Sequence, residues 1–296
     1  MTQGNTKAQR ILVTGANKGI GLAIVEAILQ RADTVVILGS RDLERGNAAV
    51  QRLVTTKPEW RDRLVAVALD VTSDASVASA RDRVLESSAG EELYGLVNNA
   101  GIASGDLATI LETNLLGMQR VCAAFVPHLR PAGGRVVNVT SAAGPSFVAN
   151  CSPEQQRFFL NPDLTWAELL AFTDRCRKLS GPTELAAAGL GDGAPYGLSK
   201  ACANTYTLIL AREQQSLVVN ACTPGFIATD MTRHFVDSQQ KSPEELGMKA
   251  PAEGAKAPLH LLFGELAGSG RYYGSDAKRS PLDRYRAPGS PEYSGD

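Results

Sequence analysis

Histidine, cysteine and long apolar runs are all scarce in this chain of 296 residues. The three histidines are widely spaced, which argues against a metal site. The cysteines are odd in number and form no C-x-x-C pair, a usage typical of reduced thiols in a cytosolic chain rather than of a disulfide framework or a zinc site. They are Cys122, Cys151, Cys176, Cys202 and Cys222.

Charge and hydropathy exclude two further kinds of partner. A net charge of −1 leaves no polybasic surface for nucleic acid or anionic lipid. No apolar run reaches the ~20 residues that span a bilayer, and the polar residues 1–10 lack an apolar signal segment. We therefore expect a cytoplasmic protein that binds neither nucleic acid nor a membrane.

Short apolar segments alternate with segments of helical apolar spacing along most of the chain. The expected strands are 11–13, 35–38, 64–69, 93–98, 135–139, 217–221 and 271–274. The expected helices are 19–30, 42–54, 73–87, 110–129, 196–214 and 255–263. This alternation predicts an α/β fold with a doubly wound parallel sheet of about seven strands, a Rossmann fold in a single domain over residues 1–296.

Two stretches depart from this alternation, residues 142–195 and the tail 275–296. In the first, Ser152 before Pro153 is typical of a helix start, and Thr165 with Glu168 forms a capping-box pattern before an apolar-periodic segment. We expect a helical insertion whose end, rich in Gly, Ala and Pro, is irregular. The tail is expected to be either disordered or a strap across the surface.

A glycine-rich turn, T-G-A-N-K-G-I-G at 14–21, follows the first expected strand and opens a helix. Its glycines allow a tight turn and a close approach of the backbone to a pyrophosphate, and the helix N-terminus adds donors and a positive dipole end. The strand-turn-helix context predicts a dinucleotide site. The residues assigned to it are Gly15, Asn17, Lys18, Gly19, Ile20 and Gly21.

The end of the second strand indicates which dinucleotide is bound. NAD sites usually place an acidic residue there to hold the ribose 2′-OH, whereas here Ser40 takes that position and Arg41 follows. Arg45 and Lys18 are expected to converge with Arg41 on a 2′-phosphate, unless Arg45 is a solvated helix residue. Charge-assisted bonds contribute ~1.5–3 kcal/mol each, so two would favour NADPH over NADH by at least about two orders of magnitude. Asp42 is the counter-signal, but it more readily caps the helix.

The end of the third strand supplies a second contact with the nucleotide. Asp70 could accept a bond from the adenine amino group, with Val71 beside it in the same pocket. The alternative is that Asp70 is a turn residue before Thr72.

Tyr196 and Lys200 lie four residues apart, which places phenol and ammonium on one face of a helix. A tyrosine with a pKa of ~10 is a poor acid at neutral pH, but a nearby cation stabilises tyrosinate and lowers that pKa. Taken alone the pair is more typical of a solvated helix face. Behind a dinucleotide turn it predicts a proton-transfer site.

Together these residues resemble the short-chain dehydrogenase/reductase family over roughly residues 8 to 275. The marks of the resemblance are T-G-x-x-x-G-I-G at 14–21, Asn98-Asn99-Ala100-Gly101, Asn114, Ser141, the Tyr196/Lys200 pair, and Pro224-Gly225 with Thr229. The chain is most similar to the carbonyl-reductase-like branch, which includes plant ketone reductases of alkaloid and terpenoid metabolism. That likeness lies in residues 14–25, Arg41-Asp42 with Arg45, 219–222, 229–231 and the insertion from Cys151.

The resemblance implies a role for each member of a tetrad. Tyr196 would protonate the carbonyl oxygen, and Lys200 would bind the nicotinamide ribose and lower the tyrosine pKa. Ser141 would hold and polarise the substrate carbonyl, and Asn114 would position a water in the proton relay behind Lys200. The simpler alternatives are a capping or bridging Asn114 and an ordinary strand-end hydroxyl at Ser141.

The resemblance also implies further contacts with the cofactor. The segment Asn98, Asn99, Ala100 and Gly101 would lie along it, with Pro224 and Gly225 beside it. Residues 227–229, which include Ile227 and Thr229, would close over the nicotinamide amide. The chain departs from the branch in two places, since residues 101–114 are shorter than usual and the tail has no counterpart.

The expected function is the NADPH-dependent reduction of a ketone or aldehyde to an alcohol, with a small-molecule carbonyl substrate. One alternative is an NADP-linked alcohol dehydrogenase of a secondary metabolite, and an enone reductase is disfavoured because Tyr196 is intact. The other alternative is a non-catalytic NADP-binding regulator, which should have lost Ser141, Tyr196 or Lys200.

The insertion also predicts the oligomeric state. In the family two long helices, here about 110–129 and 196–214, often pair with their copies to form a dimer face. The insertion carries two amphipathic segments, 152–160 and 165–179, whose apolar side chains need a surface to cover. We expect them to dock on those helices and leave a monomer. The alternative is a lid over the substrate mouth.

Overall fold

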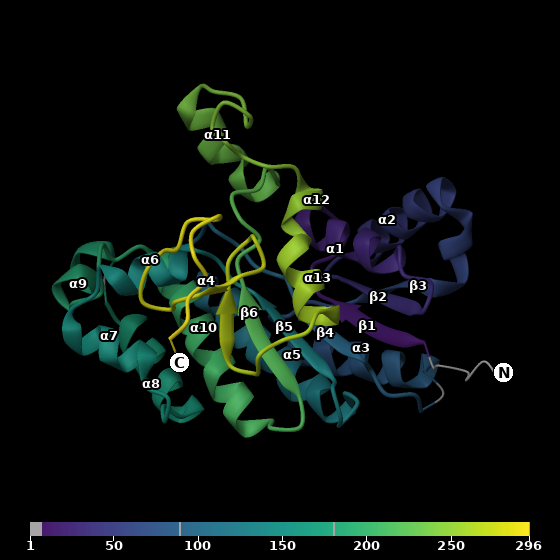
Figure 1. Cartoon of the computed structure of the whole chain (residues 1–296), viewed down its shortest axis with the longest axis horizontal. Helices are drawn as coiled ribbons and strands as arrows, with labels where there is room; N and C mark the ends of the chain where they lie inside the picture. The colour runs from purple at the N-terminus through teal and green to yellow at the C-terminus, as the bar shows by residue number, and fades with distance from the viewer. Residues whose placement is uncertain (1–7, 89, 180, 296) are drawn as a thin grey trace.

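The computed structural model describes residues 8–88, 90–179 and 181–295 and contains one eight-stranded sheet with helices on both faces (Figure 1). The strand order is β3-β2-β1-β4-β5-β6-β7-β8, and every neighbouring pair is parallel except β7 with β8. The strands are β1 (Gln9–Val13), β2 (Thr34–Ser40), β3 (Leu64–Ala68), β4 (Gly95–Asn98), β5 (Arg135–Val139), β6 (Val218–Cys222), β7 (Arg271–Tyr273) and β8 (Arg279–Ser280).

This topology confirms the predicted doubly wound parallel sheet in a single α/β domain. All seven predicted strands are present, and β8 adds an eighth through the antiparallel pair Tyr272 and Ser280. Its sequence is rich in charge and followed by proline, so no apolar pattern revealed it. The strand order reverses between β1 and β4, and such a switch point opens a crevice at the carboxyl ends of the strands.

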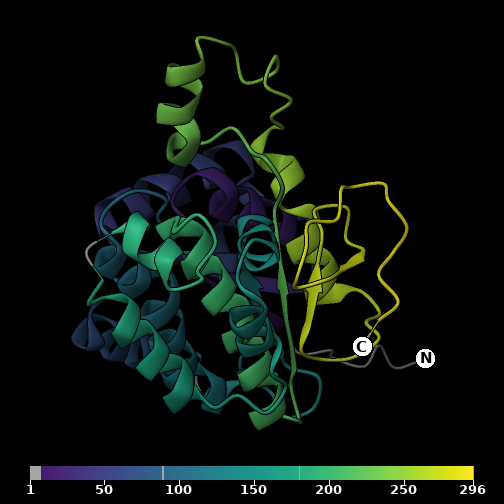
Figure 2. The same ribbon diagram turned by 90° about the vertical axis from the view of Figure 1, so that its left-hand side faces the viewer.

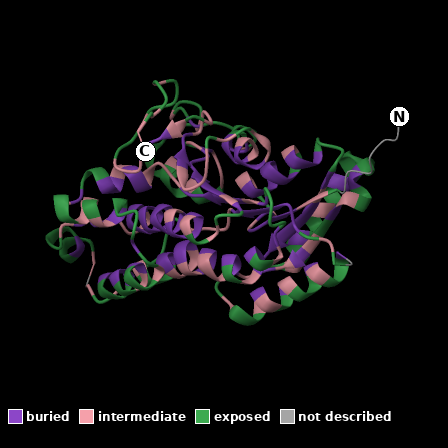
Figure 3. Cartoon of the chain, turned by 60° about the horizontal axis from the view of Figure 1, so that its bottom comes forward, coloured by how far each residue is buried: buried purple, intermediate pink, exposed green. Residues whose placement is uncertain are grey.

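Two hydrophobic clusters lie on the two faces of the sheet, because successive strand residues point to opposite sides. Leu12 and Ile37 belong to one cluster and Ile11 and Val36 to the other. The first face carries α3 (Asp74–Ser87), α4 (Leu107–Leu111), the π-helix η2 (Glu112–Leu116), α5 (Gly117–Phe125), η3 (Val126–His128) and α10 (Pro195–Glu213). The second carries α1 (Gly19–Leu29), α2 (Leu43–Thr56), η1 (Pro58–Arg63), α12 (Pro251–Gly254) and α13 (Lys256–Phe263). Buried residues follow the sheet and the inner helix faces, and exposed residues follow the outer helix faces and loops (Figure 3).

Residues 142–195 hold four helices: α6 (Ala143–Ala149), α7 (Pro153–Leu160), α8 (Trp166–Cys176) and α9 (Pro182–Ala187). Both predicted helix starts are confirmed, since Ser152 caps α7 and Thr165 forms a capping box with Glu168. The expectation of an irregular end was wrong for α9. Pro182 at its first position fits a helix start, and Leu185 is buried in the core.

Helices α7 and α8 pack on α10, most of which is buried. Trp166 lies edge to face on Tyr206, with ring centroids 5.3 Å apart. The hydroxyl of Thr205 donates to the carbonyl of Phe159 (3.1 Å), and Arg212 donates to the carbonyl of Leu164 (2.6 Å). The insertion is therefore fastened to α10 by both apolar and polar contacts.

Two segments after β6 lie outside the sheet and the helices that cover it. After η4 (Asp230–Thr232), the helix α11 (Arg233–Gln239) stands away from the body in both views (Figures 1 and 2). The tail up to residue 295, yellow in Figures 1 and 2, runs as a strap beside β7 and β8, which is the second of the two predicted alternatives. Arg286 anchors it by an ion pair with Asp276 and a bond to the Ser280 hydroxyl (2.9 Å).

Candidate active site

The glycine turn between β1 and α1 is shaped for a close approach of the backbone to a ligand. Gly15 and Gly19 have φ of +61° and +57°, a conformation that side-chain-bearing residues rarely adopt. A Cβ at Gly21 would lie 2.5 Å from the carbonyl oxygen of Gly15. No side chain caps the first turn of α1, so its N–H groups can face an anion beside Asn17 and Ile20.

The segment after β4 is fastened to this turn by Thr14. Its hydroxyl accepts from the backbone N–H groups of Asn99 and Ala100, both at 3.0 Å. The Asn99 amide donates to the carbonyls of Thr14 and Gly15 (3.0 and 3.1 Å). Asn98 differs from its prediction, because its side chain faces the core and donates to Asn138 Oδ1 (2.9 Å). Only its backbone is free to lie along a cofactor.

Of the three cations predicted to hold a 2′-phosphate at the end of β2, two are paired with carboxylates of this chain. Ser40 is buried and donates to the carbonyl of Asp42 (2.7 Å), and Asp42 caps α2 as predicted. Arg45 Nε lies 3.3 Å from Asp42 Oδ2, and Lys18 Nζ lies 2.9 Å from Asp230 Oδ2. Within the described ranges Arg41 makes no hydrogen bond or ion pair.

Asp230 was missed because it lies far from Lys18 in the sequence. The bond from Lys18, together with nearby Arg233, holds the pKa of the Asp230 carboxyl below its usual range. No local pattern marks such a pair, since the two residues come from different crossovers of the fold.

The loop after β3 carries the predicted adenine contacts. One carboxylate oxygen of Asp70 accepts from the N–H (3.0 Å) and hydroxyl (2.7 Å) of Thr72, which is the turn arrangement left open by the sequence. Its other oxygen has no partner among the described residues. Val71 is buried, and its carbonyl accepts from Arg120 (2.7 Å).

Tyr196 and Lys200 lie one turn apart at the start of α10, where Pro195 occupies the first helical position. Lys200 Nζ lies 5.6 Å from the centroid of the Tyr196 ring and donates to the carbonyl of Val139 (3.4 Å). Ser141, which follows β5, lies within hydrogen-bonding reach of the Tyr196 hydroxyl. The structure thus brings three of the four predicted tetrad side chains to one point.

Burial controls the protonation of this pair. Lys200 is only 4% exposed, and burial lowers the pKa of its ammonium to about 8. Burial also raises the pKa of Tyr196, and the hydrogen bond with Ser141 offsets that only in part. The resemblance implied a lowered pKa for Tyr196, whereas in the structure this pKa is raised. Desolvation of the phenolate is the larger effect here.

Asn114, the fourth member, lies in the π-helix η2 and bridges two segments. Its Oδ1 accepts from the N–H of Ile102, and its Nδ2 donates to the carbonyl of Ile102 (both 2.9 Å) and to the Ser199 hydroxyl (3.0 Å). A Cβ at Gly101 would lie 3.1 Å from Asn114 Oδ1 and 3.5 Å from Lys200 Nζ. Asn114 and Lys200 therefore border the same small space, which only glycine leaves open.

The segment after β6 lies against the glycine turn. Gly225, which follows Pro224, has φ of +97° and packs against Ser275, 3.0 Å from the position of a Cβ. Ile227 is buried, and the Thr229 side chain lies 3.5 Å from the position of a Cβ at Gly19. This places Thr229 next to the turn.

The part of the chain that the structure describes contains no cluster of His, Cys, Asp and Glu suited to a metal ion. Within the same ranges, no helix has the length and apolar character to cross a bilayer.

Comparison with known proteins gives consistent matches. The family model of short chain dehydrogenases matches residues 9–153. Carbonyl reductase (NADPH) 1 of Rattus norvegicus is 33% identical over 269 residues, which cover 85% of this chain and 90% of the relative. Among solved structures, salutaridine reductase from Papaver somniferum has a TM-score of 0.74 at 26% identity, covering 90% of this chain and 99% of that one. Menthone neomenthol reductase from Mentha piperita has a TM-score of 0.72 at 26% identity, covering 91% and 99%.

The relatives and solved structures match over 85% or more of this chain. On the similarity to the rat enzyme and the fold shared with the two plant reductases, the chain belongs to the short-chain dehydrogenase/reductase family.

Proposed function

We propose that this protein reduces a ketone or aldehyde carbonyl to an alcohol with NADPH. The observation that carries the proposal is the convergence of Ser141, Tyr196 and buried Lys200 at the carboxyl end of the sheet, beside the glycine turn. The relatives named carbonyl reductase (NADPH) support the same reaction and cofactor.

The residues present fit a dinucleotide phosphate. The space at Gly15 and Gly21, which a Cβ would fill, suits the pyrophosphate, and Arg41 with Lys18 and Arg45 suits a 2′-phosphate. Asp70 Oδ2 is available for the adenine amino group. When bound, NADPH supplies a hydride, and that chemistry belongs to the cofactor.

The side chains handle the proton. The Tyr196 hydroxyl would donate its proton to the carbonyl oxygen, and Ser141 would donate a hydrogen bond to the developing alkoxide. The tyrosinate that remains would be stabilised by the Lys200 ammonium. It would regain a proton from solvent through Lys200 and the space beside Asn114. The raised pKa of Tyr196 keeps the phenol protonated at neutral pH, as a proton donor requires.

The oligomeric state and cellular setting form part of the same proposal. Helices α7 and α8 pack on α10, one of the two helices through which members of the family often pair, so we infer a monomer. The net charge of −1 and the odd number of cysteines without a C-x-x-C pair support a cytoplasmic protein that binds no nucleic acid or membrane. Light scattering at micromolar concentration tests the monomer, and a stable dimer would show that the insertion does not block pairing.

A substrate screen tests the function. NADPH oxidation should be followed with quinones, α-dicarbonyls, aromatic aldehydes, and terpenoid and alkaloid ketones, and at least one class should be turned over. NADPH binding without turnover of any class would favour a non-catalytic regulator instead.

A further inference from the structure

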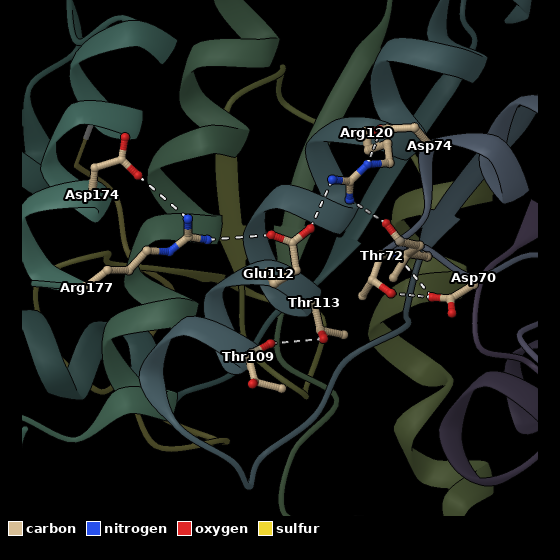
Figure 4. A network of polar contacts seen from close by, with 10 residues as sticks. Asp70, Thr72, Asp74, Thr109, Glu112, Thr113, Arg120, Asp174 and Arg177 are labelled. Atoms are coloured by element: carbon tan, nitrogen blue, oxygen red, sulfur yellow. Dashed lines mark hydrogen bonds and ion pairs between the residues drawn. The ribbon is translucent and has the colours of Figure 1, made fainter.

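Five charged side chains form a continuous network (Figure 4), and one of them, Glu112, lies in the same π-helix as Asn114. They come from α3, η2, α5 and the end of α8, so the network joins the insertion to the body of the fold. Its members are Asp74, Glu112, Arg120, Asp174 and Arg177.

Arg120 is the centre of this network. Its side chain is 19% exposed and uses all three nitrogens: Nε pairs with Asp74, Nη1 donates to the carbonyl of Val71 (2.7 Å), and Nη2 donates to Glu112 (2.9 Å). The planar guanidinium can serve these three partners at once, which an ammonium cannot. One side chain therefore fixes the loop after β3 and the start of η2 relative to each other.

Glu112 carries the connection further. Its second oxygen lies 3.6 Å from Arg177, which also lies 3.6 Å from Asp174 in the insertion. Glu112 is the first residue of the π-helix that holds Asn114, and its carbonyl accepts the wide-turn bond from Gly117. A π-helix is rare and frequently marks a functional site. The first residue of this one is held by the bonds of Glu112 with Arg120 and Arg177.

We propose that Arg120 and Glu112 are positioning residues for the reaction proposed above, on which this inference rests. Arg120 holds the Val71 carbonyl, and with it the wall of the adenine pocket. Glu112 holds the π-turn, and with it the contact of Asn114 with Ile102 beside Lys200. Through Arg177 the insertion stabilises the same turn.

The contact of Arg120 with Val71 (the Arg120 arm) and the contacts of Glu112 at the π-helix (the Glu112 arm) predict different defects when they are lost. Arg120→Met should weaken NADPH binding about tenfold and also lower kcat about tenfold, because a charge-assisted bond is lost on each arm. Glu112→Gln should lower kcat by about fivefold and leave the NADPH dissociation constant within about twofold, because the Val71 contact persists. Arg177→Met should show a weaker form of the Glu112 defect.

Arg81→Met is the matched control. Arg81 lies on α3 in the same groove as Arg120, but in the described ranges it bonds only the neighbouring Asp82 (2.7 Å). Its loss should change neither binding nor kcat.

Hydrogen exchange gives a readout that needs no turnover. Exchange of the Ile102 amide, which donates to Asn114 Oδ1, should quicken in Glu112→Gln and Arg120→Met but not in Arg81→Met. The dissociation constant for NADPH, measured by fluorescence, tests the Arg120 arm in the same way.

The outcomes separate the two proposals. A wild-type protein that turns over no carbonyl would refute the proposed function, while NADPH binding and amide exchange would still decide the network. Variants that lose only melting temperature, with binding, kcat and Ile102 exchange all unchanged, would overturn the positioning roles. If Arg120→Met does not fold, Arg120→Lys and Arg177→Met decide, and unchanged values for both would overturn them equally.

Discussion

The start of α10 carries a buried charge, whereas the rim of the nucleotide pocket, formed by Lys18, Arg41 and Arg45, carries exposed ones. Lys200 is 4% exposed, whereas the side chains of Lys18 and Arg45 are 61% and 71% exposed and each pairs with an aspartate. Buried charges interact strongly and shift pKa values, while exposed pairs are weakened by water and salt. Substitutions near Lys200 should therefore nearly abolish activity, and substitutions at the rim should tune it.

The largest expected effect is that of Tyr196→Phe. The change removes only the transferable proton, so kcat should fall by about 10²–10⁴-fold, the usual contribution of a general acid. The NADPH dissociation constant should stay within about twofold. Single-turnover kinetics and fluorescence titration measure the two.

Lys200→Ala is the contrasting variant. It should damage both kcat and NADPH binding, since Lys200 is also proposed to hold the ribose. A Tyr196→Phe protein that retained more than a few per cent of wild-type kcat would remove Tyr196 from the role of acid.

The pH profile should follow the buried lysine. Burial lowers the pKa of Lys200 from 10.5 to about 8, so the ammonium is present below pH 8 and lost as the pH rises through that value. Because the ammonium is the required form, kcat should fall about tenfold per pH unit above pH 8. A Lys200→Arg protein keeps its positive charge above pH 8. Its kcat should be lower than that of the wild type but should not fall in this pH range. A flat wild-type profile to pH 10 would contradict the assignment.

At the rim, Arg41→Ala should have the greatest effect on cofactor preference. Arg41 has no ion-pair partner within the described ranges, so its whole charge is available to a 2′-phosphate. Losing one charge-assisted bond should lower kcat/KM for NADPH by about tenfold or more. The kcat/KM for NADH should stay unchanged. Adding Ser40→Asp should move the preference further towards NADH.

Lys18→Ala and Arg45→Ala should cost less, about two- to fivefold, because each cation must first leave Asp230 or Asp42. A wild-type protein that uses NADPH and NADH equally would contradict all three assignments. An effect of Lys18→Ala larger than that of Arg41→Ala would show that the Asp230 pair assists the site.

The smallest effect is expected far from both regions, at the insertion. Thr165→Ala removes the capping box of α8 and should lower the free energy of unfolding by about 1 kcal/mol, with kcat unchanged. Denaturant unfolding measures the loss, and Thr165→Ser is the control that keeps the cap. A tenfold loss of kcat would instead make the insertion part of the site.

Local patterns explain why so much of the molecule could be predicted from the sequence. Apolar spacing gave the seven parallel strands, and capping residues gave the starts of α2, α7 and α8. The glycine turn was predictable because only glycine fits the backbone at Gly15 and Gly21. These features depend on neighbours in the chain, which a sequence displays directly.

Features that depend on contacts between distant parts of the chain could not be predicted from such local patterns. Nothing local marks the pairing of β8 with β7, which depends on where the two strands meet. The inward turn of the Asn98 side chain and the raised pKa of Tyr196 are equally unmarked, because burial decides both.

By itself the sequence determined the alternation of strands and helices along the chain, the dinucleotide turn and the Tyr196/Lys200 pair. Only the tertiary structure decided which charges meet: Lys18 with Asp230, and Glu112 with Arg120 and Arg177. The physical reason is that an ion pair forms where packing brings two distant elements within about 4 Å of each other, and that packing is the result of the whole fold.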